Sequence, residues 1–532
     1  MTSLSGTLLD PLRNRIFNGR LTVEAGKIVA VDDFGTAEMK PPFILPGFVD
    51  SHIHIESSML LPPEFARTVV RHGTLGVLAD PHEIANVLGV QGVTALMDMA
   101  EGLPLVFGFA VPSNVPVSTF ETAGGHVTAA EAEVLFRDPR ITHLGEVMNV
   151  PGVLAGDKEL MAKIAAAKAA GKAVDGHAPL LAGEPLARYA AAGITTDHEC
   201  ETEADGENKV AAGIFVQLRS GSAARNLDAL LPVLRRHPAS CMFCSDDRHP
   251  DDLLLGHVNK MAAIAVTSGI GVLDVLRAAC VNPVRHYKLP LGLLQEGDSA
   301  DFIVVRDLED FVPEAVFFRG EELLSAPFPR QATDITGLNN FKAAPVAPDD
   351  FRQVADTLPV IGVNDGSLIT DKIPASAFPR EAYAALPRLA VLNRYTEGAK
   401  PAVAPVTGLG EIKGALASSV AHDSHNIIAA GSNRRALAAA VNAIIAHGGG
   451  IAVADEAGNI IANLALPVAG LLSADSAEHV ADGYQKCTRA ARAIGSTLSA
   501  PFMALSFLSL PVIPHLKLTD RGLVDTDAFT FL

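Results

Sequence analysis

Residues 46–60, PGFVDSHIHIESSML, are the most informative segment of this chain for its architecture. An apolar run leads into His52-Ile53-His54, which is the pattern of a buried strand whose end carries polar side chains. Successive side chains of a strand point to opposite faces, so His52 and His54 share one face and both imidazoles can reach one ion. The stretch therefore predicts a strand that ends in a metal site.

Further apolar runs of similar length follow, separated by segments of helical period. Such alternation is typical of βα units around a parallel sheet, and eight units predict an α/β fold built on a (β/α)8 barrel. The expected strands are 44–56, 74–80, 105–113, 141–149, 172–177, 193–199, 213–219 and 239–246.

Active sites of such barrels lie at the carboxyl ends of the strands. These ends carry six candidate metal ligands: His52, His54, Glu146, His177, His198 and Asp246. Imidazole and carboxylate donors suit Zn, Mn or Fe, and Glu146 stands where one carboxylate can bridge two ions. Because two divalent ions lower the pKa of a shared water, the set predicts a hydrolase centre.

Other polar residues follow the same strands. Asp80 and Glu83 either take part in the chemistry or cap a helix expected to begin near Ile84. Glu199 and Asp247 are either catalytic groups or partners of the ligands. The residue pattern alone leaves both alternatives open.

The segments before and after the barrel differ from it in their patterns of apolar and polar residues. Residues 1–43 and 290–343 contain strand patterns, and since barrel termini lie close together, we expect them to pair into a small flanking β-sandwich domain. Residues 44–289 form the expected barrel. Ala-rich helical segments and apolar strands at 344–532 predict a C-terminal α/β domain of α+β composition.

Composition excludes several classes of protein. The 532 residues are 48% hydrophobic and carry a net charge of −18, without a Lys/Arg-rich run, which argues against binding of a nucleic acid polymer. Five scattered cysteines do not make a disulfide framework. Neither a signal peptide nor a membrane-spanning run is present, so we expect a cytoplasmic protein without a membrane partner.

Motifs along nearly the whole chain resemble one family. The stretches DPHEIANVLG (80–89) and CSDDRHPDDLL (244–254) are the most specific, and SSVAHDSHNII (418–428) and KLTDRGLVD (517–525) extend the similarity to the C-terminus. On these motifs the chain resembles the bacterial adenine deaminases of the amidohydrolase superfamily.

The resemblance implies a metal-dependent hydrolase that acts on a C–N bond of a cyclic amidine. It implies hydrolysis of adenine to hypoxanthine and ammonia in purine salvage, by hydroxide in a dinuclear centre held by the six candidate ligands. The implied ions are two per chain, Mn(II) or Fe(II), with Zn(II) compatible. The partners it implies are the small molecule adenine and further copies of the same chain, expected as a homodimer.

Deamination needs a base for the water and a proton donor for the ring nitrogen and the leaving amine. We assign the water proton to Asp246 and the purine protons to Glu83, with Glu199 as the second candidate for that shuttle. Further groups are expected to position the substrate: Asp80, Ser113 and Arg219.

Alternative functions differ in class. A related amidohydrolase could deaminate another base or open a cyclic amide, and a decayed barrel could only bind metal. A cytidine-deaminase type of zinc site, with Glu56 and the Cys241/Cys244 pair, is rejected because the cysteines lie far along the chain in an apolar strand. Ammonia release from adenine separates these alternatives.

The chain departs from the family pattern at a few positions. Asn114 stands where the family usually has Cys, and Asn393-Arg394-Tyr395 and the segment 407–415 also differ. The cluster His422–Asn426 combines Ser, His and Asp, which could suggest a nucleophilic triad, but adjacent residues cannot easily adopt triad geometry. We therefore expect this cluster to line the pocket or to have a structural role.

Overall fold

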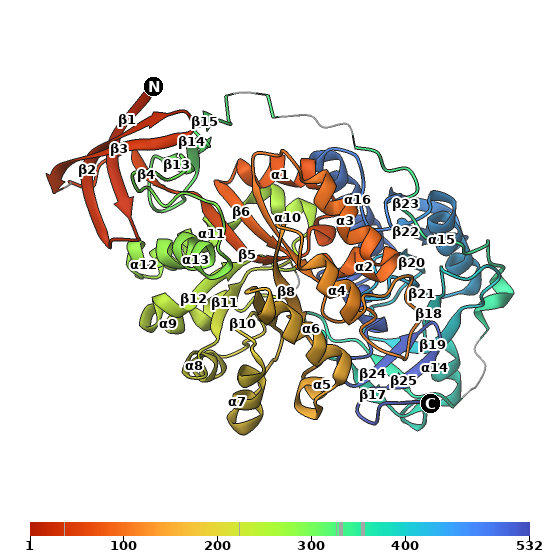
Figure 1. The fold of residues 1–532 in the computed structure, drawn as a ribbon. Coiled ribbons are helices and arrows are strands. Elements are labelled where there is room, and N and C mark those ends of the chain that lie inside the picture. Colours follow the sequence, from red (N-terminus) through yellow and green to blue (C-terminus); the bar gives the residue numbers. More distant parts are fainter. Residues whose placement is uncertain (37, 223, 326, 329–332, 353–356) are drawn as a thin grey trace.

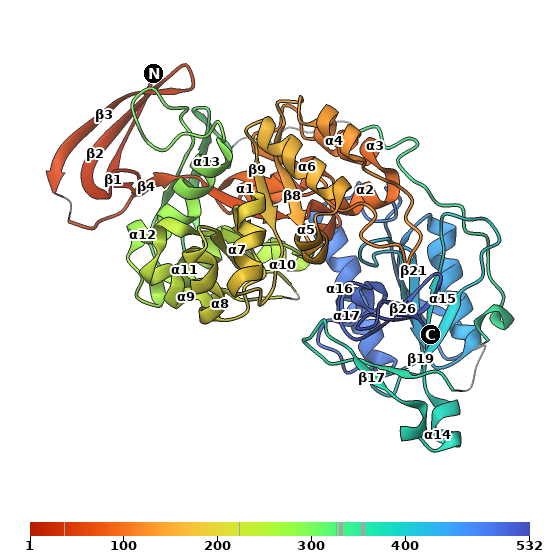
Figure 2. The same cartoon turned by 60° about the horizontal axis from the view of Figure 1, so that its bottom comes forward.

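The computed structural model describes residues 1–36, 38–222, 224–325, 327–328, 333–352 and 357–532. A β domain containing the N-terminus lies at one end, a barrel lies in the middle, and the C-terminal domain lies at the other end (Figure 1). The view in Figure 2 gives the same order. Among the described residues, no helix has the length and apolar character needed to cross a membrane.

Parallel strands form the predicted barrel at the centre. They hydrogen-bond in the orders β5-β6-β7-β8-β9 and β10-β11-β12. Between the two groups, Thr195 N donates to Val174 O at 2.9 Å. Asp246 N, just after the last strand, donates to His52 O of the first strand at 3.0 Å, and this contact closes the barrel. The strands are β5 (Phe48–Ile53), β6 (Thr74–Ala79), β7 (Val106–Val111), β8 (Ile141–Val147), β9 (Ala173–Gly176), β10 (Thr196–Asp197), β11 (Phe215–Arg219) and β12 (Cys241–Cys244).

Helices cover the outside of the barrel (Figure 1). They include α1 (Pro62–Val70), α2 (His82–Leu88), α3 (Val90–Met99), α4 (Ala129–Leu135), α5 (Val150–Ala155), α6 (Lys158–Ala169), α7 (Gly183–Ala192), α8 (Glu203–Ala211), α9 (Leu227–Arg236), α10 (Pro250–Leu255), α11 (Val258–Thr267), α12 (Val272–Leu276) and α13 (Asn282–Tyr287). Their apolar faces and the strands form one continuous core, which fixes the polar strand ends.

The first expected strand is two strands in the structure. Its beginning, β4 (Phe43–Pro46), belongs to the flanking sheet, whereas β5 belongs to the barrel. The chain turns between them at Gly47, where a Cβ atom would lie 2.5 Å from Leu75 Cδ1, so only glycine fits this approach. One continuous apolar run therefore contains a junction between two sheets.

The flanking β domain joins both sides of the barrel in one sheet, with the order β15-β14-β13-β4-β1-β2-β3. The strands are β1 (Thr2–Asp10), β2 (Arg15–Glu24), β3 (Lys27–Thr36), β4, β13 (Phe302–Val305), β14 (Pro313–Phe318) and β15 (Glu321–Glu322). The pair Ile303 and Leu45 joins the two sides, and a separate apolar core that includes Leu21 and Phe302 stabilises the domain.

The C-terminal domain contains a mostly antiparallel sheet in the order β17-β16-β19-β18-β21-β20-β22-β23. Its strands are β16 (Val360–Gly362), β17 (Asp371–Ile373), β18 (Arg388–Leu392), β19 (Ala402–Thr407), β20 (Gly414–Ser418), β21 (Ile427–Gly431), β22 (Gly450–Asp455) and β23 (Ile460–Ala465). A small sheet contains β24 (Leu516–Thr519), β25 (Gly522–Asp525) and β26 (Thr530–Phe531). The helices are α14 (Arg380–Ala385), α15 (Arg434–His447), α16 (Ala477–Ala493) and α17 (Pro501–Ser506).

The barrel and the C-terminal domain are in direct contact. Ser473 N donates to Met59 O at 2.9 Å, and Asn426 Nδ2 donates to Thr122 O at 2.9 Å. Asn426 ends the loop between β20 and β21, so this loop reaches the barrel. The predicted boundaries at residues 43, 289 and 343 stay a prediction, although strand pairing places β4 with the flanking sheet.

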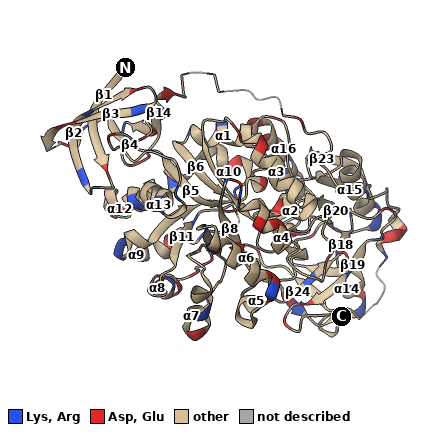
Figure 3. Ribbon diagram, viewed as in Figure 1, with Lys and Arg blue, Asp and Glu red and all other residues tan. Residues whose placement is uncertain are grey.

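Charged residues are distributed along many elements of the fold. Lys and Arg are scattered over helices and strands in all three regions, and Asp and Glu are interspersed with them (Figure 3). Most of the side chains predicted to form the site are instead buried near the strand ends.

Candidate active site and metal centre

Four imidazoles from the ends of three strands, β5, β9 and β10, converge inside the barrel mouth. His52 Nε2 lies 3.2 Å from His54 Nε2, and the His52 ring stacks on that of His198 with centroids 4.1 Å apart. The ring of His177 meets that of His198 edge to face. His54 Nδ1 donates to Asp80 O at 3.0 Å, so the neutral ring carries its lone pair on Nε2, facing the cluster.

Two carboxylates lie among these rings. Glu146 Oε2 lies 2.6 Å from His177 Nδ1 and 3.1 Å from His198 Nε2, while its Oε1 lies 3.5 Å from His54 Nε2. Asp246 Oδ1 lies 3.2 Å from His54 Nε2. Glu146 thus faces both histidine pairs, as a carboxylate that bridges two ions must.

The donor set has the chemistry of a divalent metal site. The groups His52–His54–Asp246 and His52–Glu146–His198 each place three ligand atoms within 4.8 Å of one another. Burial raises the pKa of Glu146, but His177 and His198 outweigh it and lower that pKa well below the usual range. Ionised carboxylates beside imidazole lone pairs are the donors that Mn, Fe and Zn take, so the residues fit such ions.

Asp246 is held in one orientation by backbone and side chain. Its φ of 52° lies in the left-handed region, which for a non-glycine residue is a local strain of the kind found at functional sites. Arg219 Nη1 donates to Asp246 Oδ2 at 2.7 Å and also to Glu199. Glu199 is therefore paired with a guanidinium, and Arg219 holds its pKa below the usual value against the opposing effect of burial.

Asp80 and Ser113 contact the backbone of Glu146. Glu146 N donates to Asp80 Oδ2 at 2.8 Å, and Ser113 Oγ donates to the carbonyl oxygen of Glu146. The first turn of helix α2 is capped by Glu56, whose Oε1 accepts from Ile84 N at 3.1 Å, so the helix-capping alternative for Asp80 and Glu83 is wrong. These contacts fix the end of β8 from the residues that follow β6 and β7.

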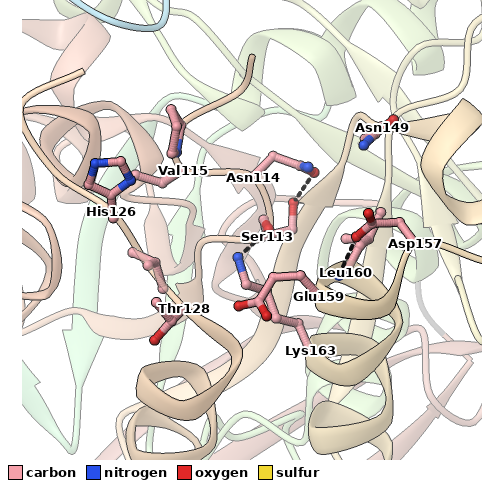
Figure 4. Close-up of a pocket in the computed structure, with 12 residues that line it drawn as sticks. Ser113, Asn114, Val115, His126, Thr128, Asn149, Asp157, Glu159, Leu160 and Lys163 are labelled. Carbon is pink, nitrogen blue, oxygen red and sulfur yellow. Dashed lines mark hydrogen bonds between the residues drawn. The ribbon is translucent and has the colours of Figure 1, made fainter. Parts of the chain in front are cut away.

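A cavity of about 340 Å³ lies beside Ser113 (Figure 4). Lys163 Nζ donates to Ser113 O at 2.8 Å, and Asn114, His126 and Thr128 also line the space. Among the described residues, its lining includes no candidate metal ligand. Asn114, one of the departures from the family pattern, therefore faces this side cavity, next to the Ser113 contact with Glu146.

The side chain of Glu83 projects from the first turn of α2 and contacts the C-terminal domain. Its Oε1 lies 2.5 Å from His422 Nδ1, and its Oε2 bonds His425 Nε2. The HDSH pattern at residues 422–425 marks this segment in the sequence, but no sequence signal connects it with Glu83. Ser424 Oγ accepts from Asn426 Nδ2 at 3.2 Å, and both histidines bond Glu83 instead of forming a triad with Ser424.

Two further residues escaped the sequence analysis. His82 lies against His54, with ring centroids 4.5 Å apart, and its Nε2 lies 3.4 Å from Glu83 Oε1. Asp197 accepts from the backbone N–H groups of Glu199 and Ala178, and from Lys209 Nζ at 2.6 Å. The available signal was their position, since each directly adjoins a predicted site residue.

Comparisons with known proteins agree with this architecture. Residues 43–323 match the amidohydrolase family, and residues 374–530 match the adenine deaminase C-terminal domain. A protein of Salinibacter ruber named adenine deaminase is 46% identical over 100% of this chain and 98% of its own length. One of the same name from Sulfurovum is also 46% identical, over 99% of each chain.

Among solved structures, a β-aspartyl dipeptidase from Fervidobacterium islandicum AW-1 is 14% identical, with a TM-score of 0.45 over 62% of this chain and 100% of its own. The fold and the buried donor set define a metal-dependent hydrolase barrel. By full-length similarity, the chain belongs to the amidohydrolase family and, within it, to the adenine deaminases.

Proposed function

We propose that this chain hydrolyses adenine to hypoxanthine and ammonia, a reaction of purine salvage. The observation that carries the proposal is that relatives named adenine deaminase match the chain from end to end at 46% identity. The unbroken set of strand-end donors supports it, because a decayed barrel need not retain four imidazoles and two carboxylates around one point.

We propose that the six candidate ligands, His52, His54, Glu146, His177, His198 and Asp246, hold two divalent ions. Mn(II) or Fe(II) is the expected pair, and Zn(II) fits the same donors. When bound, the ions acidify water, so that a nucleophile for C6 of adenine is available near neutral pH. Support comes from the position of Glu146, whose two oxygens face different histidines.

The remaining chemistry is assigned to side chains of the chain. Asp246 accepts the proton of the attacking water, and Arg219 holds its other oxygen. Glu83 takes up one proton of the water and passes it to the ring nitrogen N1, and it then carries the other water proton, held by Asp246, to the leaving amine. Glu199 stays the second candidate for this shuttle, but its pairing with a guanidinium favours Glu83, whose partners are imidazoles.

Asp80, Ser113 and Arg219 stay predicted substrate-positioning groups. The contacts of Asp80 and Ser113 with the backbone of Glu146 support a position close to the reacting centre. The homodimer, the cytoplasmic location and the three-domain division also belong to this proposal. Analytical ultracentrifugation of the full chain tests the dimer, since a single species of monomer mass would contradict it.

Turnover of four bases by Mn-loaded protein tests the proposed substrate. We expect adenine to give the highest kcat/KM, and adenosine to be poor because ribose at N9 would leave buried polar groups of a closed site unpaired. Guanine and cytosine serve as further comparisons. Equal or better ammonia release from any of these three would contradict adenine as the substrate and favour a related amidohydrolase that deaminates another base.

A further inference from the structure

Glu83 lies at the junction of the barrel and the C-terminal domain, and both of its oxygens are occupied. Its partners His422 and His425 come from the loop between β20 and β21, more than 330 residues away in the sequence. The side chains are buried, with exposed fractions of 2% for Glu83, 3% for His422 and 1% for His425. We call these three residues the Glu83 clamp.

The hydrogen bonds of His425 define its tautomer. Ala421 N donates to His425 Nδ1 at 3.2 Å, so the lone pair is on Nδ1 and the proton is on Nε2. That proton is donated to Glu83 Oε2. Burial lowers the pKa of His425 to about 4, although Glu83 acts in the opposite direction, and the ring is therefore a neutral donor.

His422 differs from His425 in charge and in support. Burial opposes protonation, but the carboxylates of Glu83 and Asp247 outweigh it and raise the pKa of His422 to about 9. The ring stacks on Phe507, with centroids 4.5 Å apart and planes at 14°. Nδ1 of this imidazolium donates to Glu83 Oε1, so one charged and one neutral donor hold the carboxylate.

We propose that His422 and His425 are positioning residues for deamination, which hold the Glu83 carboxylate in one orientation beside the metal cluster. The C-terminal domain then completes the catalytic site of the barrel. The inference rests on the proposed function, in which Glu83 moves protons to the purine. A free glutamate has three rotatable bonds, and misplacing a shuttle by about 1 Å can cost about 100-fold in rate.

Amide substitutions test the clamp atom by atom. In His422→Asn the amide nitrogen takes the place of Nδ1, and in His425→Gln it takes the place of Nε2, whereas His422→Leu and His425→Leu provide no donor. Each Leu variant should lower kcat about 10- to 100-fold with KM little changed, and the matched amide variant should restore most of kcat. His447→Leu, at an exposed histidine of α15, is the control.

Combination with Glu83→Gln separates positioning from a general structural effect. If the histidines act through Glu83, then His422→Leu should add little to the loss already caused by Glu83→Gln. Independent losses that multiply would overturn the proposal. Metal content and melting temperature are measured for the amide variants as well. Two ions per chain and an unchanged melting temperature would show that differences in kcat do not come from misfolding or metal loss.

Other outcomes separate this inference from the proposed function. An unmodified enzyme that does not deaminate adenine overturns the function. An enzyme that does, and that loses activity in Glu83→Gln but keeps full kcat in both Leu variants, overturns the clamp alone. His82, Glu83 and Asp423 also place ligand atoms within 4.8 Å of one another. A third ion per chain that is lost in Asp423→Asn would overturn the clamp, because Glu83 would then be held by a metal ion.

Discussion

The strand-end cluster and the Glu83 clamp lie next to each other but are built in different ways. The cluster collects side chains from barrel strands, each placed by a short apolar run that precedes it. The clamp joins an α2 residue of the barrel to a loop of the C-terminal domain. The barrel can therefore hold the donor set by itself, whereas the orientation of the proposed proton shuttle depends on a second domain.

Loss of a cluster residue should have the largest effect. His52→Ala removes a buried imidazole that belongs to both ligand groups around Glu146 and Asp246. We expect metal content measured by plasma mass spectrometry to fall and ammonia release to drop to background. The control is His447→Leu, and full metal content with normal turnover in His52→Ala would break the assignment of the cluster.

The two proposed acid–base groups should differ in metal dependence. Glu83→Gln and Asp246→Asn should each lower kcat at least about 100-fold, the lower end of general acid–base effects. Asp246→Asn should also weaken metal binding, because Asp246 lies in the cluster, whereas Glu83→Gln should retain two ions. Near-normal kcat in Glu83→Gln would move the shuttle to Glu199.

The same difference explains what the sequence could predict. Strand periodicity and polar strand ends are local patterns, and they were enough for the barrel and for the convergence of the donors at its mouth. The contact of His422 and His425 with Glu83 depends on how two domains pack, which no local pattern carries. The junction at Gly47 was missed for a related reason, because one apolar run served two sheets.

A buried ion pair below the cluster should affect stability more than chemistry. Lys209 Nζ and Asp197 Oδ2 are 2.6 Å apart with both side chains fully buried, and Asp197 also holds the backbone next to His177 and His198. Lys209→Met leaves that carboxylate without its cation, a change that typically costs about 3–5 kcal/mol. Urea unfolding should show a lower midpoint, with kcat reduced less than in Glu83→Gln. An unchanged midpoint would contradict the structural role of the pair.

The smallest effect is expected at an exposed contact of the same domain interface. Arg67 of α1 pairs with Glu478 of α16 at 2.7 Å, but the Glu478 side chain is 53% exposed, so water and salt screen the pair. Glu478→Gln should lower the free energy of unfolding by less than about 1 kcal/mol and leave kcat unchanged. Comparing kcat of Glu478→Gln with kcat of His422→Leu at equal metal content tests whether any weakening of this interface slows deamination. If Glu478→Gln lowers kcat as much as His422→Leu does, domain contact in general would be required, and the special position of the Glu83 clamp would be lost.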